Sequence, residues 1–266
     1  MREEIRCFLE TDNAEDLSYN KTFFSQLAIL EEGNFWFQAR NRLICWCLER
    51  FFSNSCRFLE IGCGTGFVLK AIKEKFKDFH LAGAELFFEG LRFAKTRLPE
   101  TEFIQLDVLD MPFVGHFDGI GVFDVLEHIE DDEQAIKKIS LALKPGARLI
   151  LTVPQHMFLW GHMDRLAFHK RRYSRMDLLT KLTEANLRVN FVTSLVTLLL
   201  PLMWLSRLKR RESDDVTEEL RIGAVANSCL SAIMRLEYFL ITSAQLRFPF
   251  GGSLLVVCQK CETANA

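Results

Sequence analysis

Short apolar runs alternate with longer amphipathic stretches through the middle of the chain. Each apolar run has the length of a strand, and the stretches between runs repeat their apolar positions at helical spacing. The runs that we predict as strands are 57–61, 80–85, 102–105, 117–123 and 147–153. The helices predicted between them are 67–76, 88–98 and 132–143, with a turn at Lys144-Pro145-Gly146. Strands that alternate with helices of this length indicate βαβ units and a parallel sheet.

The two ends of the chain follow other patterns. Residues 13–52 are predicted to be helical, and Ser174 is a suitable N-cap for a helix over 175–185. Two further strands are predicted at 187–193 and 254–259. We therefore expect one structural domain with four parts: an N-terminal helical cap (1–52), a cofactor-binding core (53–193), a helical insertion (194–248), and a last strand with a C-terminal tail (249–266).

A glycine-rich turn joins the first predicted strand to its helix. Glu60-Ile61-Gly62-Cys63-Gly64-Thr65-Gly66 places three glycines where the backbone must turn tightly and approach a ligand. The helix that follows presents free N–H groups. Phe67 stands where a dinucleotide-binding fold would continue toward its third glycine, which disfavours a nicotinamide-dependent oxidoreductase.

Two acidic residues follow at the ends of the next strands. Glu85 ends the second predicted strand, where a carboxylate can accept hydrogen bonds from a ribose diol. Asp107 follows the third predicted strand and offers an acceptor to an adenine amino group, although a turn role suits it as well. Together with the glycine turn, these acids predict a nucleoside-containing ligand.

Because these motifs occur in this order along the chain, the chain resembles the class I S-adenosylmethionine-dependent methyltransferases, of the type 11/12 and ubiquinone-methyltransferase kind. The matching segments are 58–66, Glu85, 107–113, 123–129 and 143–154, and the resemblance covers about residues 35–190. It implies an α/β fold with a Rossmann-like, doubly wound sheet of seven strands in the order 3-2-1-4-5-7-6, the last strand antiparallel. It also implies S-adenosylmethionine as cofactor and S-adenosylhomocysteine as product.

The resemblance assigns cofactor contacts residue by residue. Gly62, Gly64 and Gly66 would lie against the methionine part, Glu85 would bind the ribose, and Asp107 with the Val108 backbone would bind the adenine. Similar quinone-pathway methyltransferases hold the cofactor's carboxylate with an Arg, which we place at Arg42 with Arg40 as the alternative. The full predicted set is Arg42, Glu60, Gly62, Gly64, Gly66, Glu85, Leu86, Asp107, Val108 and Phe123.

The fourth predicted strand leads into Asp124-Val-Leu-Glu127-His128, at the sheet edge where such folds bind ligands. Methyl transfer from a sulfonium needs alignment of the acceptor and, for a hydroxyl, a base. Histidine titrates near neutrality, so His128 is our candidate base, with Glu127 and Asp124 beside it. The alternatives are a structural histidine or a set of metal ligands, and we expect no bound metal.

The loop over 154–174 carries a W-x3-D-x4-H-x-R-R-Y pattern after the fifth predicted strand. Loop residues on a rigid scaffold often carry function, so we predict substrate contacts there. The alternative is an ion-paired brace that holds the loop. The residues concerned are Trp160, Asp164, His169, Arg172 and Tyr173.

Net charge and apolar runs indicate which classes of binding partner to expect. The formal net charge is −2, which disfavours nucleic acid, and the chain starts without an apolar signal segment, so we expect a cytoplasmic protein with reduced cysteines. The apolar run 191–205 precedes the cationic stretch 207–211. It suits a peripheral contact with the inner face of the membrane, the wall of a substrate pocket, or an oligomer contact. We expect methyl transfer, preferably to oxygen, on a small or lipid-like hydrophobic acceptor, with an inactive cofactor-binding partner subunit as the alternative.

Overall fold

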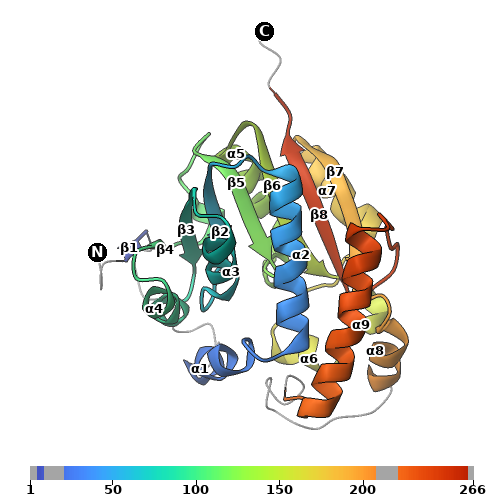
Figure 1. Cartoon of the computed structure of the whole chain (residues 1–266). Helices are drawn as coiled ribbons and strands as arrows, with labels where there is room; N and C mark the ends of the chain where they lie inside the picture. The colour runs from blue at the N-terminus through green and yellow to red at the C-terminus, as the bar shows by residue number, and fades with distance from the viewer. Residues whose placement is uncertain (1–4, 9–20, 208–220, 263–266) are drawn as a thin grey trace.

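The computed structural model describes residues 5–8, 21–207 and 221–262. Its centre is one mostly parallel sheet with helices on both faces (Figure 1). The strands run β1-β4-β3-β2-β5-β6-β8-β7 across the sheet, and β8 is antiparallel to both of its neighbours. Their bounds are β1 Arg6–Cys7, β2 Cys56–Ile61, β3 Phe79–Glu85, β4 Glu102–Gln105, β5 Phe117–Phe123, β6 Leu143–Pro154, β7 Leu187–Leu195 and β8 Ser253–Lys260.

The sheet has eight strands in the described residues, so the prediction of seven was wrong. The additional strand is β1, which pairs in parallel with β4 through Arg6 and Cys7 at one edge. A strand of two residues is too short to show a repeating pattern of apolar positions, and it lies in the segment that was predicted to be a helical cap. The predicted order of the other strands and the antiparallel end are confirmed.

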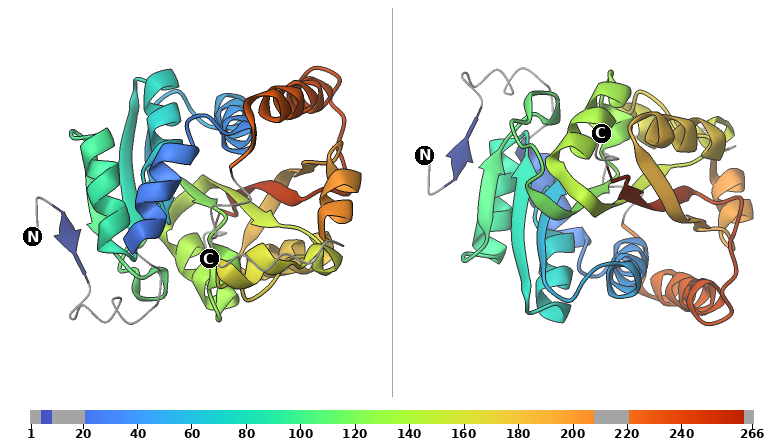
Figure 2. Two further views of the ribbon diagram at one scale, coloured as in Figure 1. Left: turned by 90° about the horizontal axis from the view of Figure 1, so that it is seen from below. Right: turned by 90° about the horizontal axis from the view of Figure 1, so that it is seen from above.

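Two helical layers cover the sheet (Figure 2). Helices α2, α3, α4 and α9 pack on one face, around a core that includes Ile44, Leu69 and Ile241. Helices α5 and α7 pack on the other face, around Ile136 and Leu178. The helix bounds are α1 Lys21–Leu30, α2 Phe35–Phe51, α3 Phe67–Lys75, α4 Phe88–Arg97, α5 Asp132–Ala142, α6 His162–Leu166, α7 Arg175–Glu184, α8 Leu200–Arg207 and α9 Ala224–Thr242.

Most predicted bounds fall within a few residues of the structure, and the differences have local causes. The predicted turn at 144–146 lies inside β6, where Gly146 has a φ of +75° and the pairing with β5 shifts register. Strand β7 continues to Leu195 and stops at Val196, whose φ of +60° ends the extended backbone. Part of the predicted N-terminal helix, 13–20, lies outside the described residues.

The segment between β7 and β8 contains α8 and α9. Helix α9 runs alongside α2, and Asn227 ties the two together (Figure 1). Its side chain accepts a hydrogen bond from the amide of Phe35 at 2.9 Å and donates one to the carbonyl of Gly33 at 2.9 Å. By length and composition alone, α9 is apolar enough to cross a membrane, with a mean hydropathy of 1.3, and 17% of that stretch is buried.

The topology brings the chemically interesting segments together. Parallel strands β2, β3, β5 and β6 all end at the same edge of the sheet, at Ile61, Glu85, Phe123 and Pro154. In such sheets ligands bind outside the carboxyl ends of the strands, where the strand order reverses. Here the order reverses between β2 and β5, and the glycine turn begins there.

Candidate functional site

The glycine turn follows β2 with left-handed backbone at three positions. The φ angles are +68° at Gly62, +50° at Gly64 and +76° at Gly66. A Cβ atom at Gly62 would lie 2.3 Å from Cγ2 of Val125, so the protein itself excludes a side chain there. A Cβ atom at Gly64 would meet no other group of the described residues within 4 Å. The open face of the turn at Gly64 is therefore the place where a ligand can approach the backbone.

Glu85 lies directly beside this turn. Its carboxylate accepts hydrogen bonds from the amides of Gly64 at 2.9 Å, Leu86 at 2.8 Å and Phe87 at 3.1 Å. Burial raises the pKa of Glu85, and these amides oppose the rise. A carboxylate has about four acceptor positions. A ribose diol that bonds to both oxygens would therefore replace at least one of these amides.

Helix α1 anchors the turn from the other side, through residues that the sequence did not point to. The hydroxyl of Thr65 donates to the buried carboxyl group of Glu31 at 2.7 Å. Arg97 donates to Glu31 at 2.6 Å and to the carbonyl of Thr65 at 2.9 Å. These three residues are far apart in sequence, so no local pattern could reveal that they hold the glycine turn in place.

Arg40, rather than Arg42, extends toward the carboxyl ends of the strands. Its guanidinium pairs with Asp124 at 2.5 Å and lies over the ring of Trp36 at 4.7 Å. Arg42 is exposed and lies over Tyr238 on α9, on the side away from this pair. The alternative left open by the sequence is thus favoured, because only Arg40 reaches the carboxyl ends of the strands.

Several buried polar atoms near the turn have no hydrogen-bond partner among the described residues. They include Nε of Arg40 and Oε2 of Glu60, a side chain with an exposed fraction of 2%. Burial raises the pKa of Glu60 well above its usual value, while the charge of Arg40 opposes the rise. Buried polar groups are seldom left unsatisfied in native proteins. Together with the open face at Gly64, these atoms fit a polar ligand with both positive and negative groups.

The other predicted cofactor residues lie along the same edge. Asp107 follows β4 and accepts a hydrogen bond from the amide of Leu109 at 2.9 Å, so one of its oxygens caps a short 3-10 turn, η2 (Val108–Asp110). Val108 is buried behind it, Leu86 follows Glu85, and Phe123 is buried at the end of β5. The turn role and the adenine role of Asp107 are compatible, because its second oxygen remains available for a ligand.

Glu127 and His128 form another 3-10 turn, η3 (Leu126–His128), after β5. Burial, together with the charge of Asp124, raises the pKa of Glu127 well above its usual value. Burial and the neighbouring His169 lower the pKa of His128 to about 4. The rings of His128 and His169 are 4.7 Å apart. A histidine with so low a pKa is a weak general base near neutral pH.

Asp164 organises the loop after β6. Its carboxylate accepts hydrogen bonds from the amide of Gly161 at 2.8 Å and from Nε of Arg172 at 2.8 Å, and it bonds Nδ1 of His169 at 2.9 Å. Burial alone would raise its pKa, but the contacts with His169, Arg172 and Gly161 lower it to about 2. These bonds describe an ion-paired brace, the alternative that the sequence left open.

Tyr173 belongs to the same support. It is 1% exposed, and its hydroxyl lies 2.7 Å from Asp132 and 3.2 Å from the carbonyl of Leu126. It therefore fixes η3 from beneath and does not face open space. Of the residues predicted for substrate contact, Trp160 and His169 are half-buried, whereas Asp164, Arg172 and Tyr173 are buried.

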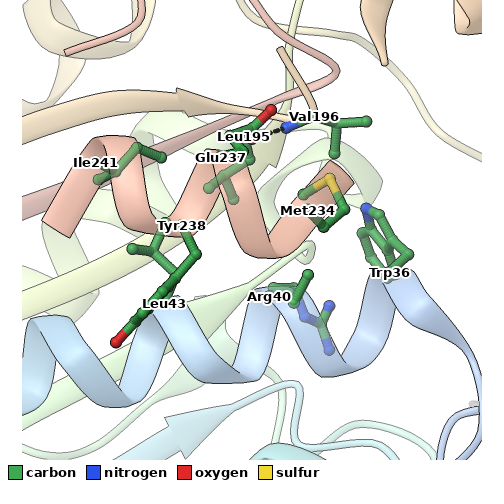
Figure 3. A pocket seen from close by; sticks show the side chains of 10 residues that line it. Trp36, Arg40, Leu43, Leu195, Val196, Met234, Glu237, Tyr238 and Ile241 are labelled. Carbon is green, nitrogen blue, oxygen red and sulfur yellow. Dashed lines mark hydrogen bonds between the residues drawn. The ribbon is translucent and has the colours of Figure 1, made fainter. Parts of the chain in front are cut away.

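A narrow cleft runs between α2 and α9 beside this site (Figure 3). Trp36 and Arg40 line it from α2, and Met234 and Tyr238 line it from α9. The buried carboxylate of Glu237 accepts a hydrogen bond from the amide of Val196 at 2.6 Å, drawn as the dashed line. It therefore fixes the left-handed turn that follows β7.

Residues 59–151 match the family model of the methyltransferase domain. This stretch is similar to that domain and makes up about a third of the chain. Solved structures of this fold superpose on most of the chain. Phosphoethanolamine N-methyltransferase 2 of Haemonchus contortus, solved with S-adenosyl-L-methionine, gives a TM-score of 0.61 at 18% identity over 94% of this chain and 60% of its own. Geranyl diphosphate C-methyltransferase of Streptomyces coelicolor gives 0.54 at 16% identity over 79% and 71%.

Curated relatives of the methyltransferase domain match part of the chain. O-methyltransferase rstn1 of Aspergillus nomiae is 29% identical over 102 residues, or 36% of this chain and 45% of the relative. Demethylmenaquinone methyltransferase of Thermotoga maritima is 28% identical over 113 residues, or 42% of this chain and 48% of the relative. The chain thus spans a little under half the length of each of these two relatives.

Proposed function

We propose that this protein transfers a methyl group from S-adenosylmethionine to a small, hydrophobic or lipid-like acceptor, and that the acceptor atom is oxygen. The observation that carries the proposal is the open backbone face at Gly64, bordered by Glu85 and by the unpaired atoms of Arg40 and Glu60. It lies within the segment that matches the methyltransferase domain.

The residues present suit the cofactor's chemistry. The guanidinium of Arg40 suits the carboxylate of the methionine part, because an Arg binds carboxylates through parallel hydrogen bonds. Glu85 suits the ribose hydroxyls, and the free oxygen of Asp107 with the Val108 backbone suits the adenine. When bound, the cofactor supplies an activated methyl group, so the protein needs chiefly to position the acceptor in line with it.

Calorimetry with S-adenosylhomocysteine tests the cofactor assignment. We expect binding of S-adenosylhomocysteine and none of NAD. Glu85→Ala should weaken that binding by about 1–3 kcal/mol, because ribose hydroxyls lose their acceptor. Glu89→Ala, at a half-buried acidic residue in the first turn of α4, serves as the matched control. Binding of NAD alone would refute the proposal, and equal affinities of wild type and Glu85→Ala would refute the ribose assignment.

The acceptor side supports hydrophobic chemistry. One relative is named for demethylmenaquinone and the other for methyl transfer to oxygen, and the cleft between α2 and α9 is lined mainly by apolar side chains. A screen of hydrophobic phenols, quinols and anionic lipids with labelled cofactor identifies the acceptor. His128→Ala is the informative variant, because full activity there would remove His128 as the base.

One fold neighbour favours a second candidate function. The [4+2]-cyclase SpnF gives a TM-score of 0.59 at 19% identity over 86% of this chain and 84% of its own. That protein is named for a reaction other than methyl transfer, so a cofactor-binding protein without methyltransferase turnover is the alternative. Binding of S-adenosylhomocysteine without labelled product from any acceptor in the screen would favour it.

The exposed apolar surface of α8 supports a peripheral contact with the inner face of the membrane. Leu202, Trp204 and Leu205 are each at least half exposed, and the sequence continues into the cations of 207–211. A short apolar helix with a Trp and flanking cations suits the interface of an anionic bilayer. Flotation with anionic vesicles tests this. We expect the wild type to float and a Leu202→Ser, Trp204→Ser variant to stay in solution, and a wild type that stays in solution would refute the contact.

A further inference from the structure

Glu127 presents a buried carboxyl group without a partner. Its exposed fraction is 0%, and neither oxygen accepts a hydrogen bond of normal geometry from another described residue. An unpaired polar group of this kind costs about 1–3 kcal/mol, and more if it is charged. Such a group in a folded protein calls for a ligand that satisfies it.

Two imidazole rings lie at the same place. His128 follows Glu127 in η3, and His169 arrives from the loop after α6. One ligand atom from each of the three residues can be chosen so that all three lie within 4.8 Å of one another. The two rings stand nearly perpendicular, at 85°, so they approach a common point from different directions.

The surrounding residues orient both rings. Nδ1 of His169 lies 2.9 Å from a carboxylate oxygen of Asp164, which the amide of Gly161 and Nε of Arg172 hold in place. A carboxylate only accepts hydrogen bonds, so Nδ1 carries the proton and the lone pair of Nε2 is left for a ligand. The backbone carbonyl of Ala167 hydrogen-bonds the ring of His128. A carboxylate or carbonyl behind each ring is the usual arrangement of metal-binding histidines.

We propose that Glu127, His128 and His169 bind a divalent transition metal ion, for which Zn²⁺ is the representative. Two imidazoles and one carboxylate suit Zn²⁺ and disfavour Mg²⁺, which prefers oxygen ligands. Neighbouring ligands of a tetrahedral Zn²⁺ are about 3.3 Å apart. The three ligand atoms lie within 4.8 Å of one another, so they must close by at most about 1.5 Å when the ion binds.

This set of ligands differs from the one that the sequence offered. Asp124 stood beside Glu127 and His128 as a candidate ligand, but its carboxylate pairs with Arg40 at 2.5 Å. His169 takes its place, from a segment about 40 residues further along the chain. With three protein ligands, the metal would keep a position open for an oxygen of the acceptor, a consequence that rests on the proposed function.

Calorimetry with ZnCl2 on the metal-free full chain tests the site. We expect one tightly bound ion in the wild type, with binding weakened more than tenfold in Glu127→Gln and in His169→Gln. Asp164→Asn keeps all three ligands but loosens His169, and should weaken binding by about 10- to 100-fold. His80→Gln replaces an exposed histidine on β3 and should bind Zn²⁺ like the wild type.

Two further measurements separate the possible failures. Cobalt substitution should give visible bands without a thiolate charge-transfer band, because no cysteine is a ligand. S-adenosylhomocysteine affinity should be the same in His169→Gln and the wild type, so loss of Zn²⁺ without loss of this ligand shows a folded variant. The metal site is refuted if the wild type binds no Zn²⁺, if His169→Gln binds it unchanged, or if a thiolate band shows that cysteines hold the ion. Zn²⁺ binding without any S-adenosylhomocysteine binding would refute the proposed function and leave the metal site standing.

Discussion

Gly64→Ala separates the folding role of the glycine turn from its role in binding. The residue has a φ of +50°, and the added methyl group would meet no other group within 4 Å in the part of the chain that the structure describes. Its cost in the free protein is therefore only the left-handed backbone, about 1–2 kcal/mol. Gly115→Ala is a matched control, because Gly115 has a φ of +57° and equally open surroundings, but lies away from the site.

Both variants should lose the same stability. With an unfolding entropy of about 2.1 cal/mol/K per residue, a chain of 266 residues should melt about 2–4 °C lower in either variant. Binding should differ. If the cofactor occupies the space over Gly64, the methyl group overpacks that contact by about 1–3 kcal/mol, which weakens S-adenosylhomocysteine about 5- to 150-fold. Gly115→Ala should bind it like the wild type.

Thermal melts and calorimetry on the same preparations check both parts. Equal affinity in Gly64→Ala and the wild type would mean that the open face of the turn is not where the ligand lies. A much larger loss of stability in Gly64→Ala than in Gly115→Ala would mean that the space over Gly64 is filled by the protein. Either result would refute the reasoning from geometry to cofactor position.

Two further predictions concern charged side chains. Arg40→Gln should weaken S-adenosylhomocysteine binding by about 1.5–3 kcal/mol, the value of a charged hydrogen bond, whereas Arg42→Gln should bind it normally; calorimetry on both decides between them. Asp132→Asn should cost about 3 kcal/mol of unfolding free energy at pH 7, because Asp132 is buried among two cations and a Tyr hydroxyl. Burial alone would raise the pKa of Asp132, but those partners lower it. The stabilisation is therefore present above about pH 4, the pKa of an Asp in the unfolded chain, and is lost as the pH falls through the lower pKa of the folded state. Urea unfolding from pH 7 to 3 should show the difference shrinking, with the exposed Asp110→Asn as control, and a constant difference would contradict the assignment.

The alternating strands and helices of the central sheet could be predicted from the sequence. Strands β4 and β5 begin and end where the apolar pattern predicts, because most of their residues are buried in the sheet. The glycine turn and Glu85 could be placed because backbone conformation and strand ends are local properties. Strand β1 could not be predicted, because two residues show no pattern of their own and its pairing partner β4 lies about 100 residues further along the chain.

The parts of the site that depend on long-range contacts could not be predicted. Arg40 and Arg42 point to different sides of α2, and the sequence does not say which side faces the strand ends. The packing of α9 against α2 decides this, because Arg42 lies over Tyr238 of α9. Glu237 carried a signal that could have been used: a buried acidic residue in the mostly apolar run 233–241 calls for a hydrogen-bond partner. Here that partner is the amide of Val196 in a left-handed turn.

Two parts of the site lie at the same edge of the sheet: the glycine turn and the proposed acceptor side. The turn at Gly62–Gly66 is fixed from several sides, by Val125 against Gly62, by Glu85 on the amide of Gly64, and by Glu31 and Arg97 on Thr65. A site held this firmly can serve one cofactor while the acceptor side changes. In the proposed function, the acceptor side comes instead from η3, the braced loop and α9, which are separate in sequence. This division explains why solved structures named for N-methylation, C-methylation and cyclisation share the fold at under 20% identity, and why the acceptor must be found by experiment on His128, His169 and the cleft beside α9.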